Sequence, residues 1–362
     1  MKRKLVSIQK VLEVSPIEGA DRIEKITING WTCVSKKGEF KKGDLCVYFE
    51  IDSFLPLEDH RYEFLAKTSK KKMYDKEGIR LRTIKFRGVL SQGLALPISL
   101  FPEIKDLEIG KDVTELLNVI KYEEPIPLQL AGEVVGPFPS FIPKTDEERI
   151  QNLPGLFEKE ELKEIPFEET MKLDGMSMTV FRTKDTFNEK TEIFPETNEQ
   201  FGVCMRNFEL RFKEDNALWK KAINLKLPQI LKELDLEIAL QGELMGEKIQ
   251  GNREKILGHE FFVFRIFDIK KQEFYTPEER LALIEKINKT YNVDLKHVPV
   301  LNRNIKIFKE VSSIQEMLER AKGKSISHNI REGIVLKSEV LYNGKTLTFK
   351  AINNEFLLKG GE

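Results

Sequence analysis

The stretch MKLDGMSMTV, residues 171–180, places a lysine, an aspartate and a glycine within four positions and then continues as an alternating strand pattern. An uncharged lysine amine is a nucleophile that can form a covalent intermediate. The same group of residues also occurs in a simple turn, where the glycine takes a left-handed conformation. The choice between these interpretations depends on the other reactive side chains and on their order along the chain.

Charged residues recur at the ends of predicted strands or within them, beyond residue 172. These residues are Asp174, Arg206, Glu243, Asp268, Glu332 and Lys350. A charged side chain in a strand is costly to bury unless it is paired or serves a ligand. With Lys172, the set has three cations and four carboxylates. If they converge on one cleft, they suit a polyphosphate and a divalent metal.

The elements that must position this set fall into two regions. The first 120 residues read as short β-rich pieces at 4–14, 22–30, 31–38, 44–51, 80–88 and 93–98, separated by Gly and Asp turn signals. Short strands that close on themselves predict a small barrel of the OB type, a fold that commonly holds nucleic acid. We expect residues 1–122 to form this OB-like domain and the proline-rich residues 123–140 to form a linker.

Residues 141–362 alternate helical and strand patterns and predict an α+β domain with antiparallel sheets and flanking helices. Thr145 with Glu148 has the spacing of a capping box and predicts a short helix there. A second capping box, Thr276 to Glu279 with a first-turn proline, predicts a helix after residue 276. Pro228 is expected to break a helix that spans residues 217–234.

Composition describes an ordinary globular protein, with 40% hydrophobic and 33% charged residues and a net charge of zero. There is no apolar run long enough to span a membrane and no secretory signal pattern. Three cysteines without metal-ligand spacing fit a reducing compartment, so we expect a cytoplasmic protein.

The segment 67–87 is strongly basic and contains two aromatic residues. Its basic side chains include Lys70, Lys71, Lys72, Arg82, Lys85 and Arg87. A basic segment of this kind could be a phosphate-facing surface or a solvated lysine-rich loop, and the segment alone leaves both open.

The motifs K-L-D-G, M-R-N, Q-G-E-L, F-D-I, R-E-G-I-V-L-K and F-K follow one another from residue 172 to 350. As an ordered set they resemble the covalent nucleotidyltransferase superfamily of DNA ligases, RNA ligases and capping enzymes. The leading β-rich domain, with FRGVLSQGLALPI, FPSFIPKTDEERIQNL and GELMGEKIQGN, resembles more narrowly the nick-sealing RNA ligase 5 family, which has an N-terminal OB domain. One departure is Ile352, where many RNA ligases carry a second lysine; Lys337 or another base could supply that charge instead.

The resemblance implies a role for each residue that matches a motif. Lys172 is the nucleophile that takes AMP from ATP, assisted by Lys350 and by a divalent metal, Mg²⁺ or Mn²⁺. Asp174 and Glu332 are expected to hold this metal through its waters. The remaining ATP-binding candidates are Arg206 at the phosphates, Glu243 at the ribose, Phe267 at the adenine, Arg149 at the pyrophosphate end, and Lys337. For Phe267 a core position, and for Arg149 a solvent-facing helix position, remain alternatives.

The predicted function is that of an ATP-dependent RNA ligase, which joins 3′-hydroxyl and 5′-phosphate ends at nicks in RNA-containing duplexes and acts as a monomer. Beside this domain, the basic segment is better read as phosphate-contacting. A DNA ligase or a GTP-using capping enzyme is one alternative, although only a dozen residues follow Lys350, too few for a trailing OB domain. A non-catalytic nucleic-acid-binding protein that senses a nucleotide is the other alternative.

Overall fold

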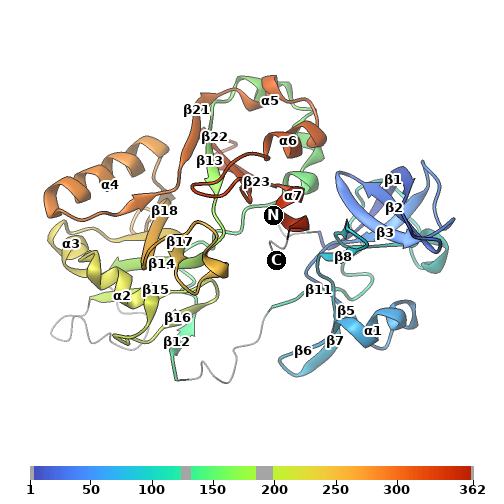
Figure 1. Cartoon of the computed structure of the whole chain (residues 1–362), viewed down its shortest axis with the longest axis horizontal. Helices are drawn as coiled ribbons and strands as arrows, with labels where there is room; N and C mark the ends of the chain where they lie inside the picture. The colour runs from blue at the N-terminus through green and yellow to red at the C-terminus, as the bar shows by residue number, and fades with distance from the viewer. Residues whose placement is uncertain (1–3, 124–131, 185–198, 360–362) are drawn as a thin grey trace. The chain divides into compact units, whose positions relative to one another are not determined.

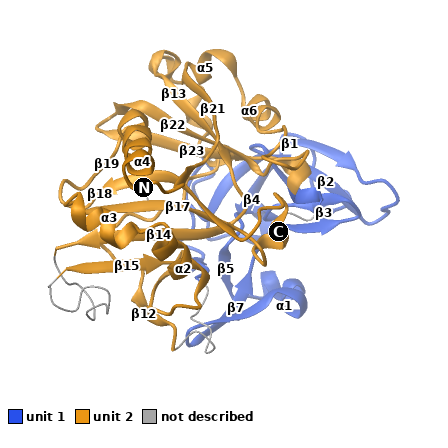
Figure 2. Cartoon of the chain, turned by 60° about the vertical axis from the view of Figure 1, so that its left-hand side comes forward, with its two compact units in different colours: residues 1–126, 357–362 blue, residues 127–356 orange. Residues whose placement is uncertain are grey.

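The computed structural model describes residues 4–123, 132–184 and 199–359, which divide into two compact units. Unit 1 comprises residues 1–126 and 357–362, and unit 2 comprises residues 127–356 (Figures 1 and 2). Within the described residues, no helix is both long and apolar enough to cross a membrane. Residues 124–131 of the expected linker lie outside the described residues, and Val134–Pro137 of that linker form strand β12.

Unit 1 is built mainly from short antiparallel strands. Its elements are β1 (Val6–Pro16), β2 (Ile23–Ile28), β3 (Trp31–Lys36), β4 (Leu45–Phe49), β5 (Ser53–Pro56), α1 (Glu63–Ser69), β6 (Lys70–Met73), β7 (Lys76–Arg80), β8 (Ile84–Phe86), β9 (Val89–Ser91), β10 (Leu94–Pro97) and β11 (Ile120–Lys121). One sheet has the order β10-β4-β1-β2-β3 and another the order β11-β5-β7-β6, while β8 pairs with β9. Strand β1 pairs with β4 through its first half and with β2 through its second, with an irregularity between Val11 and Glu13. This bend lets one strand serve two sides of the unit.

Unit 2 contains two sheets and most of the helices. Its strands are β12, β13 (Phe167–Lys172), β14 (Met176–Thr183), β15 (Gln200–Cys204), β16 (Phe208–Leu210), β17 (Ile238–Gly246), β18 (His259–Asp268), β19 (Glu273–Phe274), β20 (Lys296–His297), β21 (Val300–Ile305), β22 (Gly333–Tyr342) and β23 (Lys345–Ile352). The larger sheet has the order β12-β16-β15-β14-β17-β18-β19, with β20 beside β18, and the smaller one the order β21-β13-β22-β23. The α+β class with antiparallel sheets is therefore confirmed; β18 and β20 form a parallel pair.

The helices of unit 2 cover these sheets and follow local sequence signals. They are α2 (Ala217–Asn224), α3 (Leu227–Glu233), α4 (Pro277–Tyr291), α5 (Ile307–Glu310) and α6 (Ile314–Arg320), whereas α7 (Asn354–Leu358) spans the boundary between the units at residue 356. The capping box of Thr276 and Glu279 is present at the start of α4, as predicted. The break between α2 and α3 is also confirmed: Lys226 is left-handed, and Pro228 lies in the first turn of α3.

Apolar side chains form separate cores in each unit. In unit 2, the largest core lies between the larger sheet and helices α2 to α4 and includes Trp219. A second core packs the smaller sheet against α5 and α6. The three cysteines, Cys33, Cys46 and Cys204, are free and buried in two further core clusters, and burial raises the pKa of each thiol. They are structural thiols rather than reactive ones.

Candidate active site

The register of the smaller sheet in unit 2 brings two distant lysines onto one face. Lys172 pairs with Gly333 across β13 and β22, and Lys350 pairs with Val335 across β22 and β23. Directly opposed residues share a face, and residues two apart on a strand share it too. Lys172 and Lys350 therefore project from the same side of the sheet, although 178 positions separate them in sequence (350 − 172).

The glycines of two motifs are required by close backbone contacts. A Cβ atom on Gly175 would lie 2.7 Å from the carbonyl oxygen of Leu244, and one on Gly333 would lie 2.2 Å from that of Ala351. Gly175 has no positive φ angle, so the left-handed turn considered from the sequence is wrong. The glycine of K-L-D-G is needed because β17 passes directly beside it.

The Lys172 amine lies among carboxylates. Its Nζ donates a hydrogen bond of 2.5 Å to Oε1 of Glu332. Burial acts to lower the pKa of Lys172, but Glu332, Glu243 and Asp174 together outweigh burial and raise it. In the protein without a bound cation, these carboxylates therefore favour the charged amine. Neutralising the carboxylates with a bound cation would reverse the effect.

Two carboxyl groups of the site, those of Glu243 and Glu332, lack enough cations and hydrogen-bond donors around them. Burial, followed by the charges of Glu332 and Asp174, raises the pKa of Glu243 to about 8, although Lys172 opposes the shift. Oε2 of Glu332 is buried and accepts no hydrogen bond from the described residues. Both observations fit a site that receives a cation or a hydrogen-bond donor from a ligand.

The donor set can be tested against a divalent metal. Among the described residues, no three His, Cys, Asp or Glu side chains form a group that could hold a metal ion by themselves. Mg²⁺ commonly keeps several waters and binds through one or two carboxylates plus substrate phosphates. The orphaned Oε2 of Glu332, with Asp174 close enough to affect Lys172, fits a hydrated ion of this kind.

Lys350 and Arg206 both lie near Asp146, a residue that the sequence did not predict as part of the site. Oδ1 of Asp146 lies 3.4 Å from Lys350 Nζ and 3.4 Å from Arg206 Nη2. Burial lowers the pKa of Lys350, and the charges of Lys172 and Arg149 lower it further. The signal that could have found Asp146 is its place in the acidic K-T-D-E-E-R segment, just before the predicted pyrophosphate residue.

Residues 145–148 form no regular secondary structure and Arg149 is extended, so the helix predicted there is wrong. The amide of Lys350 donates to the carbonyl oxygen of Glu148 (2.9 Å), and Arg149 forms an isolated bridge with Lys350. Only a short 3-10 turn follows, at Ile150–Asn152. Pairing with β23 uses the backbone groups that a helix would need, and it brings Arg149 beside Lys350.

Two predicted ATP-binding residues have other partners. Lys337 shares the sheet face of Lys172 but is buried, and its Nζ donates to the carbonyl oxygen of Phe264 (2.7 Å). Burial, Arg280 and Arg265 lower the pKa of Lys337 to about 7. Phe267 is buried in a core cluster, where it packs edge-on against Phe274. Phe267 therefore lies in the protein core, as the alternative interpretation of the sequence predicted. Contact between Phe267 and adenine stays a prediction.

Two further positions complete the comparison with the sequence. Ile352, where a second lysine was expected, is buried. Asp268 accepts a hydrogen bond from the amide of Lys271 (2.8 Å) and so stabilises the turn after β18.

A buried ion pair lies on the same sheet face as Lys172: Arg280 donates to both carboxylate oxygens of Glu168, at 2.6 and 2.7 Å.

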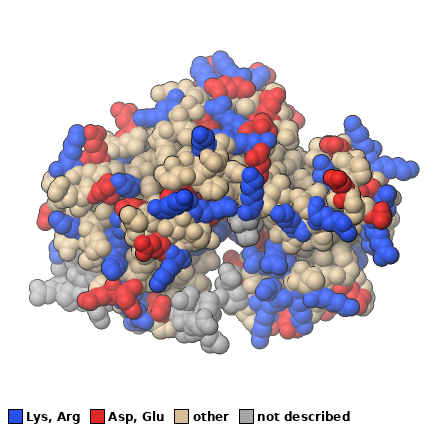
Figure 3. All heavy atoms as spheres, viewed as in Figure 1, with Lys and Arg blue, Asp and Glu red and all other residues tan. Residues whose placement is uncertain are grey.

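In unit 1, the side chains predicted to contact nucleic acid are exposed. Lys70, Lys71 and Lys72 form β6, and Lys and Arg side chains gather over the part of unit 1 where β6 and β7 lie (Figure 3). Lys70 pairs with Glu77 (2.8 Å), and Lys85 donates to the carbonyl oxygen of Leu358 (2.5 Å). Arg82 and Arg87 are exposed as well. A phosphate-contacting role for this set stays a prediction.

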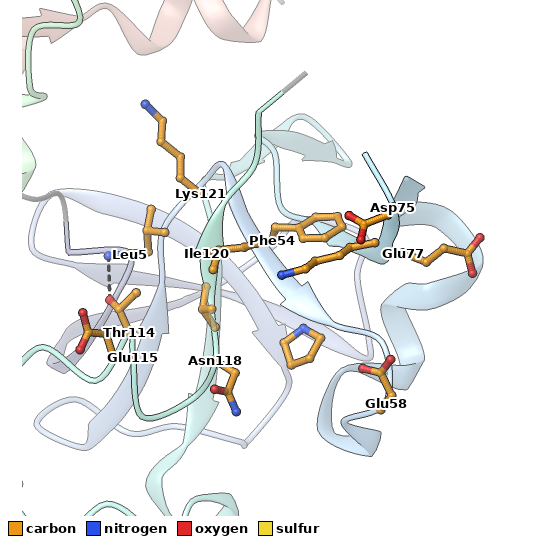
Figure 4. Close-up of a pocket in the computed structure, with 13 residues that line it drawn as sticks. Leu5, Phe54, Glu58, Asp75, Glu77, Thr114, Glu115, Asn118, Ile120 and Lys121 are labelled. Carbon is orange, nitrogen blue, oxygen red and sulfur yellow. Dashed lines mark hydrogen bonds between the residues drawn. The ribbon is translucent and has the colours of Figure 1, made fainter. Parts of the chain in front are cut away.

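Unit 1 also contains a pocket of about 860 Å³. Phe54 and Ile120 contribute apolar surface, and Glu58, Asp75, Glu77 and Glu115 contribute carboxylates (Figure 4). Two lysines, Lys76 and Lys121, also line the pocket, so its four carboxylates leave the lining net negative and less suited to phosphates than β6.

Comparisons with known proteins agree with both regions. A family model described as an OB-fold domain matches residues 5–98, and one described as RNA ligase matches residues 165–352. No curated protein sequence matches the chain.

Solved structures of an RNA ligase from Naegleria gruberi are similar over the whole chain. A mutant with AMP and Mn has 44% identity and a TM-score of 0.78, with 99% of each chain covered. The ligase with PPi has 44% identity and a TM-score of 0.77, also with 99% of each chain covered. A mutant with ATP and Mn has 43% identity and a TM-score of 0.76, with 99% of this chain and 100% of the other covered. The chain has an OB-fold domain followed by a ligase domain, and it belongs to the RNA ligase family.

Proposed function

We propose that the protein is an ATP-dependent RNA ligase that joins a 3′-hydroxyl to a 5′-phosphate at nicks in RNA-containing duplexes. The main support for this proposal is that Glu332, Glu243 and Lys350 all lie close enough to interact with the amine of Lys172. The similar ligase from Naegleria gruberi, solved with ATP, AMP, PPi and Mn, supports the choice of nucleotide and metal. Residues 1–122 act as the nucleic-acid-contacting domain, 123–140 as a linker and 141–362 as the adenylation domain.

In the first step, Lys172 Nζ forms a bond to the α-phosphorus of ATP, and the bond to the bridging oxygen of pyrophosphate breaks. The amine must first lose its proton, for which Oε1 of Glu332 is the hydrogen-bonded acceptor. A divalent ion, when bound, neutralises carboxylate and phosphate charge. Asp174 and Glu332 would hold such an ion through its waters, and its charge would offset the carboxylates that raise the pKa of Lys172.

Lys350 and Arg206 act on the reacting phosphates. Both cations already point at one oxygen of Asp146, which marks a position where a phosphate oxygen can take its place. Preorganised cations of this kind stabilise charge that develops in the transition state. Glu243 binds the ATP ribose, and Arg149 contacts the pyrophosphate end. Lys337, whose Nζ donates to a backbone carbonyl in the protein without nucleotide, stays the candidate for the charge absent at position 352.

The second and third steps transfer AMP to the RNA 5′-phosphate and then release AMP when the 3′-hydroxyl attacks. Lys70, Lys71, Lys72, Arg82, Lys85 and Arg87 contact RNA phosphates during these steps. Such contacts position a strand without reading its sequence, and their contribution falls as salt rises.

The first test is incubation with α-labelled ATP and Mg²⁺ or Mn²⁺. We expect label that survives denaturation in the wild type and in Lys270→Ala, an exposed lysine of the same unit, but not in Lys172→Ala. Absence of covalent label with either metal refutes the proposal and leaves the nucleotide-sensing alternative. Sealing of all-DNA nicks as fast as nicks with a 3′-hydroxyl RNA strand refutes the RNA preference.

A further inference from the structure

Two loops of unit 2 meet beside the Lys172 site, at residues 247–258 and 323–331. The amide of Ser327 donates to Oε2 of Glu254 at 2.6 Å, which joins the loops. Ser325 donates to the sulfur of Met171 (3.6 Å), whose side chain points to the sheet face opposite Lys172, and the second loop ends directly before Glu332, which accepts a hydrogen bond from the Lys172 amine. We call this pair of loops the ledge. It adjoins the site through Glu332, yet the adenylation chemistry described above uses none of its side chains.

The backbone of the first loop is held in an unusual shape. Lys248, Gln250, Asn252 and Lys255 all have positive φ angles, between 43° and 64°. Such angles are uncommon for residues other than glycine and carry a cost in free energy. The Asn252 side chain donates to the carbonyl oxygen of Ile256 (2.9 Å) and accepts from its amide (3.0 Å), which locks the turn. The loop is therefore a built feature with a defined surface.

That surface exposes apolar side chains. Leu257 is 89% exposed, the highest value among the exposed large hydrophobic residues, and Ile326 on the second loop is 44% exposed. A single exposed leucine is common and needs no explanation by itself. Here the leucine lies in a hydrogen-bonded loop that Glu254 joins to the segment before Glu332.

The same loops expose cations. Lys248, Lys255 and Lys324 are exposed, and none of them forms an ion pair with a described residue. Of the two carboxylates of the first loop, Glu254 is buried and accepts from Ser327, whereas Glu247 is exposed and accepts from the amide of Gly258 (3.3 Å). The ledge therefore offers three exposed lysines against one exposed carboxylate.

We propose that the ledge binds the RNA strand next to the joint, with its three lysines on phosphates and Leu257 against a ribose or base face. Charge complementarity favours nucleic acid over a protein partner, because unpaired cations beside an apolar tip match an anionic backbone with apolar sugars and bases. This inference rests on the proposed function, since it assigns a binding surface for the substrate of that reaction.

The first experiment compares Leu257→Ser with Leu341→Ser, a leucine on β22 that is 69% exposed. Both changes replace solvent-exposed side chains, so folding is retained. We expect Leu257→Ser to weaken binding of a nicked RNA duplex about tenfold, the loss expected when one buried leucine contact is removed. Lysine adenylation should stay at the wild-type rate, and Leu341→Ser should bind like the wild type.

The second experiment replaces the ledge lysines Lys248, Lys255 and Lys324 by alanine and measures duplex binding against salt. Each phosphate contact contributes about 0.9 to the slope of log affinity against log salt, so the slope should fall by about 2 to 3. The control replaces three exposed lysines elsewhere in the unit, Lys220, Lys270 and Lys286.

Binding and sealing are measured separately, so the two proposals can fail separately. Wild-type affinity and salt slope in both ledge variants would overturn the ledge and leave the ligase proposal intact. If the wild-type protein neither becomes adenylated nor seals a nick, the ligase proposal is overturned.

Discussion

Replacing Asp146 by Asn should tighten the binding of ATP and pyrophosphate. In the protein without nucleotide, Asp146 Oδ1 lies 3.4 Å from both Lys350 and Arg206. A phosphate that binds these cations must displace this carboxylate. Asp146 therefore competes with the ligand, and removing its charge removes the competition.

The size of the effect follows from these distances and exposures. Two charges 3.4 Å apart attract by about 1 kcal/mol in water and about 5 kcal/mol at an effective dielectric constant near 20. Arg206 is 68% exposed, so its pair is worth less than about 1 kcal/mol. Lys350 is 20% exposed and its pair contributes about 1 to 2 kcal/mol. A bound phosphate breaks both ion pairs of Asp146, so most of their attractive free energy is lost on binding. A difference of about 1.4 kcal/mol corresponds to a tenfold change in affinity.

The assay is calorimetric titration of pyrophosphate at neutral pH, with Asp215→Asn as a control that removes an exposed carboxylate of the same unit. We expect about a tenfold lower Kd for Asp146→Asn and no change for Asp215→Asn. Asp146 also helps to keep Lys350 charged against burial, so the variant should lose its advantage as pH rises. Equal or weaker binding by Asp146→Asn would show that the carboxylate positions the two cations rather than competing for them.

Further predictions concern the same fold and site. Lys350→Ala should slow lysine adenylation about 10²- to 10³-fold, which single-turnover labelling measures; a wild-type rate would remove Lys350 from the phosphate site. Because the carboxylates raise the pKa of Lys172, the neutral amine is scarce at neutral pH, so adenylation should accelerate as pH rises. More divalent metal should move that rise to lower pH, and a flat pH profile would contradict this account. Replacing lysines 70–72 by alanine should reduce the salt dependence of RNA binding and spare adenylation; an unchanged slope would return β6 to a solvated surface. Glu168→Gln should leave Arg280 buried with a weaker partner and lower the free energy of unfolding by about 3 kcal/mol; denaturant melting with an unchanged midpoint would refute this.

The sequence predicts the reactive residues well where strand patterns carry them. Lys172 and Lys350 occupy strand positions that alternation makes visible, and antiparallel pairing then brings them to one face. The protonation of Lys172 could not be predicted, because it depends on how many carboxylates surround the amine after folding. The sequence places Glu332 and Glu243 at strand ends but does not give their distances from residue 172.

Local signals fail where tertiary pairing overrides them. The spacing of Thr145 and Glu148 is that of a helix start, yet this segment pairs with β23 instead. Helix α1 and the hairpin of β6 and β7 went unpredicted because their lysine-rich sequence has neither helical nor alternating periodicity. Asp146 was missed for another reason: nothing in its neighbours shows that an arginine 60 positions later meets it (206 − 146).

The burial of all three cysteines makes this chain a convenient host for thiol labelling. Maleimide dyes react with thiolates, and Cys33, Cys46 and Cys204 form them poorly because burial raises the pKa of each thiol. A cysteine introduced on an exposed loop would therefore be the preferred attachment point, without removal of the native ones. A fluorophore placed in this way could follow the arrival of a substrate strand in real time.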